Sequence, residues 1–114
     1  MKTVQELANG QTISTTIADG ATESAALELL GQIPTHLHIP SGFEGTAITF
    51  KASPDGTNYY VVYEWDDSDA SALPMTVAAG RTYQLPTALW GLRYLKIVAG
   101  TEQTGAITLY VDVL

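Results

Sequence analysis

Two groups of side chains have types and spacings that could perform chemistry. The first is the pair His36 and His38, which on a β-strand would place both imidazole rings on one face, roughly 7 Å apart, a spacing that zinc and copper sites use. Leu37 and Ile39 would then occupy the core face, so we expect the histidines to point outward. No third His and no Glu follows closely enough to complete a ligand set, and we therefore predict no metal site here.

The second group is a run of carboxylates at Glu64, Asp66, Asp67 and Asp69. Calcium ions are bound by oxygen ligands of this kind. The run lacks the D-x-[DN]-x-[DN]-G spacing of a calcium-binding loop, and acidic residues between strands usually face solvent. We predict no calcium site and no cofactor.

The chain lacks the motifs of the common catalytic sites. It has no cysteine, no G-x-S-x-G nucleophile turn, and no histidines beyond the strand pair. Glu64 and Asp66 are neighbours on one predicted strand, so they cannot easily flank a glycosidic bond from opposite sides. No glycine-rich phosphate-binding motif is present. We therefore predict that the protein is not an enzyme.

Composition limits the possible partners. A chain of 114 residues forms one domain that can bury a core without a disulfide. Only 15% of the residues are charged, against about 25% in an average soluble domain, which suggests that part of the surface is covered by something other than water. The formal charge of −7, with the five basic residues scattered, argues against nucleic-acid binding. No apolar run approaches the roughly 18 residues of a membrane span, and no export signal opens the chain, so we expect a soluble protein.

Alternating apolar and polar residues predict a chain built from β-strands. In residues 106–113, Ile107, Leu109 and Val111 share one face with Val113, while the intervening polar residues share the other. Glycine and proline signals separate the segments. The predicted strands are 12–18, 35–39, 46–52, 57–65, 73–78, 81–85, 92–99 and 106–113. About eight short antiparallel strands in one domain predict an all-β sandwich or barrel.

Three shorter segments complete this prediction. Ser53-Pro-Asp-Gly56 has the chemistry of a tight turn, so 46–52 and 57–65 should be antiparallel neighbours. Residues 21–30 contain good helix formers but also alternate, and we favour a strand because the neighbouring segments are strands. Residues 86–91 fit a single helical turn. Residues 1–11 have few core-forming side chains and are expected to form an extended N-terminal arm.

The strand predicted for residues 57–65 is apolar on both faces. The two faces hold Tyr59, Val61, Tyr63 and Trp65, and Asn58, Tyr60, Val62 and Glu64. A sandwich strand has one core face, so the other must be covered by a loop, a ligand or another chain. We hypothesise a subunit contact centred on Tyr60 and Val62, rimmed by Asn58 and Glu64 and ending near Trp65. A loop that packs over Tyr60 and Val62 is the alternative.

The two tryptophans are expected to differ. Trp90 precedes a glycine in a turn that leads into a core strand, so we predict that it is buried. Trp65 lies at the end of a strand beside four carboxylates, so we predict that it is more exposed.

The order ITFKASPDGTNYYVVYEWDD, followed by VAAGRTYQLPTALWGLRYLKIVAGT, resembles the small jelly-roll decoration, or cement, proteins of tailed bacteriophage capsids. The resemblance covers about residues 33–114. It implies a jelly-roll sandwich that is made in the host cytoplasm, binds the major capsid protein on the outer surface of the virion, and forms a homo-oligomer, either a dimer or a trimer. The acidic charge fits that outer face, because a protein lining packaged DNA would be repelled by it.

A second resemblance implies another class of function. The hairpin and the strand Arg93-Tyr-Leu-Lys-Ile97 are similar to segments of discoidin-like carbohydrate-binding jelly rolls. The implied alternative is a carbohydrate-binding module, free or on a virion appendage. Trp65 or Trp90, with Asp66 and Asp67 as acceptors, would then form the sugar platform.

Overall fold

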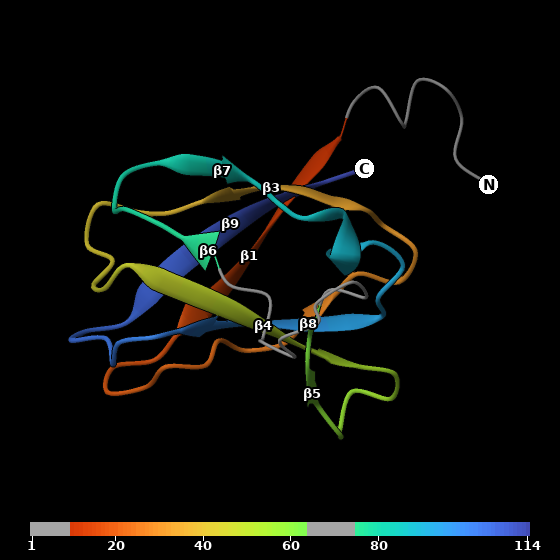
Figure 1. Ribbon diagram of the computed structural model, residues 1–114, viewed down its shortest axis with the longest axis horizontal. Coiled ribbons are helices and arrows are strands. Elements are labelled where there is room, and N and C mark those ends of the chain that lie inside the picture. Colours follow the sequence, from red (N-terminus) through yellow and green to blue (C-terminus); the bar gives the residue numbers. More distant parts are fainter. Residues whose placement is uncertain (1–9, 64–74) are drawn as a thin grey trace.

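The computed structural model describes residues 10–63 and 75–114, which fold into a sandwich of two antiparallel sheets (Figure 1). The strands are β1 (Gln11–Ile17), β2 (Leu27–Glu28), β3 (Pro34–His38), β4 (Ala47–Ser53), β5 (Tyr60–Val61), β6 (Met75–Thr76), β7 (Thr82–Gln84), β8 (Tyr94–Ala99) and β9 (Ile107–Val113). One 3-10 helix, η1 (Thr87–Leu89), lies between β7 and β8, which confirms the helical turn predicted within 86–91.

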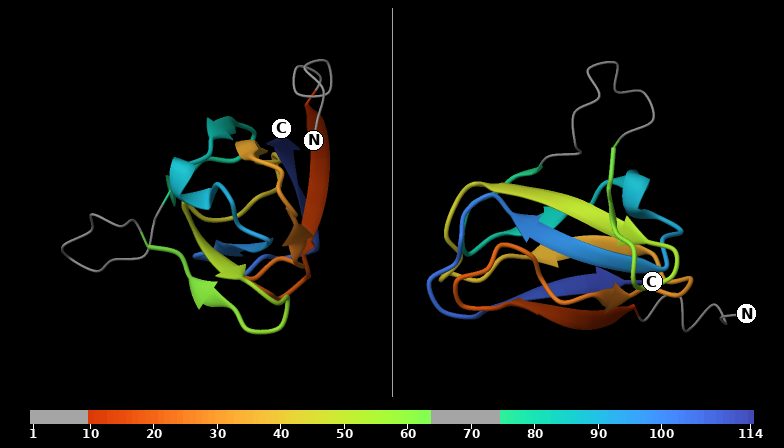
Figure 2. Two further views of the ribbon diagram at one scale, coloured as in Figure 1. Left: turned by 90° about the vertical axis from the view of Figure 1, so that its right-hand side faces the viewer. Right: turned by 90° about the horizontal axis from the view of Figure 1, so that it is seen from below.

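The order of the strands is that of a jelly roll. One sheet has the order β1-β9-β3-β7, and the other has the order β2-β8-β4-β5, with β6 also paired to β4. Strands β1 to β4 therefore alternate between the two sheets, and so do β7 to β9, as the double Greek key of a jelly roll requires. Figure 2 shows the two layers from the side and from below. The predicted all-β jelly-roll sandwich is confirmed, and its nine strands include β2, which lies within the strand favoured for residues 21–30.

The core lies between the sheets and follows the predicted alternation. Ile48 and Phe50 of β4 are completely buried, as are Leu109 and Val111 of β9 on the opposite layer. Apolar side chains two residues apart point to the same face of a strand, so each sheet offers one continuous apolar face to the other. Burial of that surface is the main term that stabilises the fold.

Residues 21–30 are extended and not helical. Ser24 donates its N–H to the carbonyl of Ile97 and accepts the N–H of Ile97 on its hydroxyl, both at 2.9 Å. β2 then pairs with β8, and Leu27 and Leu29 are buried. Ser24 takes an inner position, and Ala25 next to it is exposed. Pairing with β8 outweighs the helix propensity of the segment, as tertiary context often does.

The hairpin predicted at residues 53–56 is present, but its second strand is shorter than the predicted 57–65. β5 pairs with β4 antiparallel, with Lys51 opposite Val61. The Asp55 carboxylate accepts the backbone N–H groups of Thr57 and Asn58, both at 2.9 Å. These two residues therefore belong to the turn, and the ladder cannot start before Tyr60.

Two further predictions concern residues that the structure does not describe. The N-terminal arm lies almost entirely in residues 1–9, and the acidic run begins at Glu64, so both fall outside residues 10–63 and 75–114. Within those ranges no helix is long and apolar enough to cross a lipid bilayer.

Candidate binding surface

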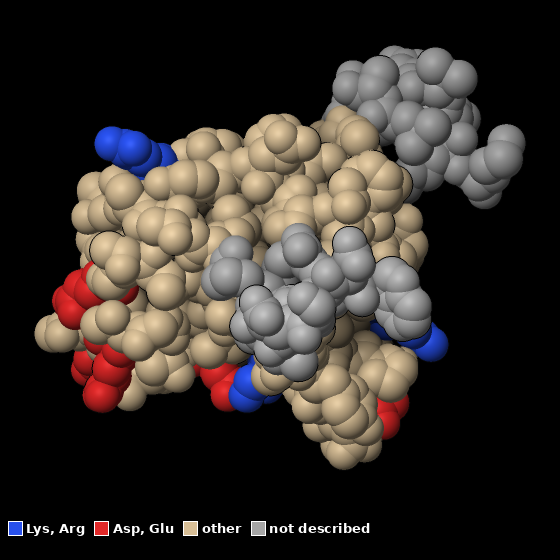
Figure 3. All heavy atoms as spheres, viewed as in Figure 1, with Lys and Arg blue, Asp and Glu red and all other residues tan. Residues whose placement is uncertain are grey.

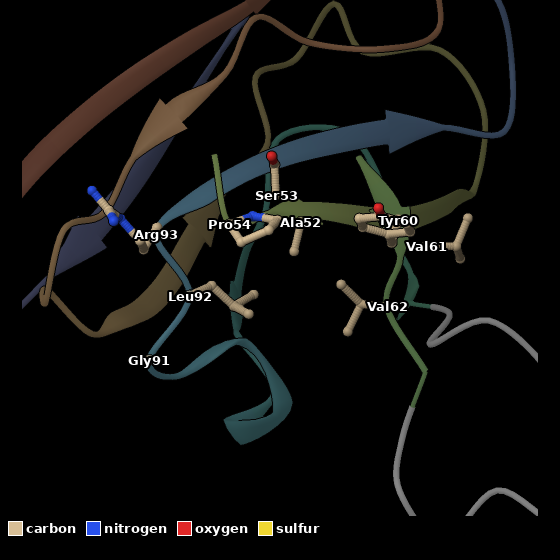
Figure 4. A pocket seen from close by; sticks show the side chains of 9 residues that line it. All are labelled: Ala52, Ser53, Pro54, Tyr60, Val61, Val62, Gly91, Leu92 and Arg93. Carbon is tan, nitrogen blue, oxygen red and sulfur yellow. The ribbon is translucent and has the colours of Figure 1, made fainter. Parts of the chain in front are cut away.

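An apolar groove separates β5 from the turn that leads into β8. Figure 4 shows Leu92 and Val62 on opposite sides of it, with the side chain of Arg93 directed away. Its volume of about 330 Å³ is at the low end of small-molecule pockets, so it suits one or two apolar side chains of a partner. The lining residues are Ala52, Ser53, Pro54, Tyr60, Val61, Val62, Gly91, Leu92 and Arg93.

The polar atoms of the turn beside the groove are already paired with one another. The Ser53 hydroxyl donates to Oδ1 of Asp55 at 2.9 Å and accepts the N–H of Gly56 at 2.8 Å. Hydrogen bonds from the backbone of Asn58 and Thr57, and from Ser53, hold the pKa of Asp55 well below its usual range. The turn is thus internally satisfied, and the groove presents mainly apolar atoms.

Large apolar side chains are exposed to water on the β5 side of the groove. Tyr60 is 65% exposed and Val61 40%, and Tyr63 lies two residues further along at 50%. Trp90 precedes Gly91 of the groove wall in the chain and is 53% exposed, although it is not among the lining residues. Apolar residues that gather around a groove are typical of a binding surface, whereas single ones are not.

The prediction that Trp90 is buried is wrong. Leu89, one residue earlier, is completely buried and takes the core position of the η1 turn. Trp90 caps that turn, donating its N–H to the carbonyl of Thr87 at 3.0 Å, and its backbone is already extended. The indole therefore points away from the core. Trp65, its predicted exposed counterpart, lies outside the described residues.

Of the five residues of the hypothesised subunit contact, the structure brings Tyr60 and Val62 together at the groove. Tyr60 and Val62 both line the groove, but Val62 is half-buried and packs against the core, whereas Tyr60 and Val61 are both exposed. The strict alternation predicted for this strand is therefore wrong, because the ladder is only two residues long.

The other three members of that contact have different positions. Asn58 belongs to the hairpin turn and donates its side-chain amide to Asp55 at 3.0 Å. Glu64 and Trp65 fall outside the residues that the structure describes. Sequence reasoning missed Pro54 and Leu92, whose only signal was that each lies beside a turn-forming glycine or aspartate.

The His-x-His pair lies on the outer face of the other sheet. Leu37 and Ile39 are buried, as predicted, and His36 is exposed. Nε2 of His38 lies 2.9 Å from Oδ2 of Asp112, and its Nδ1 lies 2.7 Å from the hydroxyl of Thr82. Both nitrogens of this ring are thus engaged within the sheet.

Asp112 extends this contact to a fourth strand, β1. It accepts the hydroxyl of Thr12 at 2.8 Å, so side chains of β1, β9, β3 and β7 form one hydrogen-bonded row. Burial raises the pKa of Asp112, but hydrogen bonds from Thr12 and His38 outweigh it, and the pKa is lowered overall. Among the described residues no three His, Cys, Asp or Glu side chains are grouped to hold a metal ion. This row ties the strands of the sheet together.

Comparisons of the chain with models of protein families, with curated proteins and with solved structures return no match. What the protein does must therefore be inferred from the groove and the side chains around it.

Proposed function

We propose that the protein is a structural virion protein that attaches to the outer surface of a phage capsid and stabilises the shell without performing chemistry. The observation that carries this proposal is the apolar groove beside β5, with Tyr60 and Val61 exposed in its wall. The resemblance of residues 33–114 to phage decoration proteins supplies the partner, the major capsid protein.

Attachment would work by burying apolar surface. A capsid side chain that fills the groove would remove Leu92 and Val62 from water, and the surrounding capsid surface would cover Tyr60 and Val61. Each large side chain that becomes fully buried contributes about 1.5–3 kcal/mol. Central aromatic residues are the ones that usually dominate such contacts.

The distribution of charge favours this orientation. Within the described part of the chain Arg93 is the only charged residue that lines the groove. Glu44 and Asp19 hydrogen-bond to the loop of residues 100–106. This loop connects β8 to β9 at the end of the sandwich that lies away from the groove. Figure 3 shows acidic side chains gathered at that end of the molecule. The described lining of the groove can therefore be desolvated at low electrostatic cost.

Co-sedimentation with empty capsids tests the proposal. Tyr60→Ser and Val61→Asp should each weaken binding at least tenfold, because a partly exposed apolar contact is replaced by a polar or charged one. Tyr110→Ser is the matched control, since Tyr110 is 47% exposed but lies on the outer face of the other sheet. Val62→Asp is less informative, because Val62 also packs against the core. Native binding by both groove variants would refute the proposal.

Carbohydrate binding is the second candidate, and the exposure of Trp90 favours it. An indole that is 53% exposed, and that precedes Gly91 of the groove wall in the chain, could stack against a sugar ring. The apolar lining offers few free hydrogen-bonding groups for sugar hydroxyls, so we rank it lower. A glycan-array signal that is lost in Trp90→Ala, together with no capsid binding, would reverse this ranking.

A further inference from the structure

No strand in the part of the chain that the structure describes pairs with the outer edge of β1 over most of its length. On one side β1 pairs in register with β9 along all seven residues, and alternate residues make the hydrogen bonds. On the other side, among residues 10–63 and 75–114, only the last residues of β1 are covered, where Ala25 donates its N–H to the carbonyl of Thr16 at 3.0 Å and Ser24 bridges Ile17. Figure 2 (left) shows β1, in red, at the margin of the molecule.

The direction of the Thr16 carbonyl identifies the free groups. In an antiparallel strand the N–H and C=O of every second residue point to the same side. The backbone groups of Thr12 and Ser14 therefore point away from β9, as the carbonyl of Thr16 does. No residue in the described ranges hydrogen-bonds to them. Two donors and two acceptors thus lie in a row on this edge.

The edge carries none of the features by which proteins usually prevent strand pairing. The sequence QTISTTI has no charged residue and no proline, and five of its seven residues are β-branched. Lysine, proline, bulges and shortness are the usual protections of an exposed edge. The strands at the other sheet ends, β7, β2 and β5, are only two or three residues long, whereas β1 has seven. β1 is therefore the strand best suited to accept a neighbour.

We propose that β1 pairs antiparallel with the β1 of a second copy of this chain, so that two four-stranded sheets become one eight-stranded sheet across a two-fold axis. With the axis at Ile13, Thr12 of each copy faces Ser14 of the other, and the two pairs exchange four backbone hydrogen bonds. This is an isologous contact, which closes at two copies.

The side chains fit this register. Ile13 is half-buried and packs against the edge of the core, so the two Ile13 side chains meet on the inner face and continue the apolar layer. On the outer face the Ser14 hydroxyl of one copy meets the Thr12 hydroxyl of the other, a favourable cross-strand pair. Pairing stops before Thr16, because Ala25 occupies that part of the edge.

The net charge of the chain predicts how dimerisation depends on salt. Each copy has a formal charge of −7, so the two copies repel one another at low ionic strength, while the paired strands themselves carry no charge. Added salt screens this repulsion, and dimerisation should strengthen. A contact made by surface ion pairs would show the opposite trend.

The test compares two substitutions of one residue. Ser14→Pro removes an outward N–H without removing a hydrogen bond to β9, and edge strands tolerate proline at such positions. Ser14→Ala keeps the N–H and is the matched control. In sedimentation equilibrium the native protein and Ser14→Ala should have twice the 12.2 kDa monomer mass, whereas Ser14→Pro should remain a monomer with native circular dichroism. Tyr60→Ser should still dimerise, which separates this contact from the groove.

Hydrogen exchange provides a second measurement on the native chain. The amides of Thr12 and Ser14 should become more protected as the protein concentration rises, even if Ser14→Pro fails to fold. A native protein that remains monomeric up to millimolar concentration would overturn the proposal. A folded Ser14→Pro variant that dimerises like the native chain would overturn it as well.

Discussion

The two ends of the sandwich are built on opposite principles. At one end Gln103, 1% exposed, holds neighbouring loops together: its Nε2 donates to the carbonyls of Glu44 and Thr101, at 2.8 and 2.9 Å, and its Oε1 accepts the N–H of Glu44 at 2.9 Å. At the other end the apolar groove is open to water, and Tyr60 in its wall is 65% exposed. The first end satisfies its polar groups internally, and the second leaves apolar surface without a partner.

This difference separates structural from binding residues. Gln103 would strike a reader of the sequence as an ordinary surface glutamine, yet it organises a loop cluster. Trp90 would strike the same reader as a core residue, yet it lies at the surface. A buried polar group must find partners, and an exposed apolar cluster loses free energy in water unless something covers it. The four predictions below test this contrast.

The largest effect is expected within the groove end itself. Leu89→Ala should lower the free energy of unfolding by about 2–5 kcal/mol, because it leaves a cavity in the core. Trp90→Ala, one residue later, should lower it by less than about 1 kcal/mol, because the indole is largely in water. Urea denaturation of both variants measures the difference. Equal losses would mean that the indole packs against the core after all.

At the opposite end, Gln103→Ala should cost about 2–3 kcal/mol of unfolding free energy. The substitution leaves the partly buried backbone groups of Glu44 and Thr101 without their partners. Capsid binding should not change, because this end does not contact the groove. Thermal denaturation and co-sedimentation of the same variant check both statements. A variant as stable as the native chain would show that water replaces the glutamine.

Two glycines, one at each end of the sandwich, allow the packing of the two ends to be compared. Gly45 and Gly56 both have positive φ, so alanine at either position should cost about 1–2 kcal/mol through backbone strain. At Gly45 a Cβ would also lie 2.6 Å from Oγ1 of Thr101, whereas at Gly56 the nearest atom is 3.3 Å away, in the ring of Tyr94. We expect Gly45→Ala to be the less stable variant in denaturant melts. If Gly56→Ala were the less stable variant instead, the end of the sandwich around Gln103 would not be the more tightly packed one.

The smallest expected effect concerns acid stability at the hairpin turn. The pKa of Asp55 in the folded state lies below its ordinary value of 3.8, so the charged form stabilises the fold above that pH. This contribution should be lost as the pH falls below about 3.8 toward the folded-state pKa. Asp55→Asn should therefore show a weaker loss of stability than the native protein between pH 5 and pH 2. Parallel curves for the two proteins would indicate that the carboxylate adds nothing as an anion.

Local pattern predicted the elements that have one buried face. Alternation gave β4 and β9 to within a residue at each end, and it placed Leu37 and Ile39 in the core and His36 outside. The turn at residues 53–56 was predictable because proline and glycine restrict the backbone in a way that depends little on the rest of the fold. Those features depend on residues two to four positions apart.

The binding surface was less predictable, because it is formed where distant segments meet. The hypothesis identified Tyr60, but it could not bring Leu92 and Pro54 to the same groove or reveal that Trp90 lies outside the core. Nor could it show that Asn58 is held by Asp55, or that Gln103 is buried among loops. The sequence by itself determined which residues alternate and where the chain turns. The tertiary structure decided which apolar residues are covered, because the space in the core is finite and only packing determines which side chains fill it.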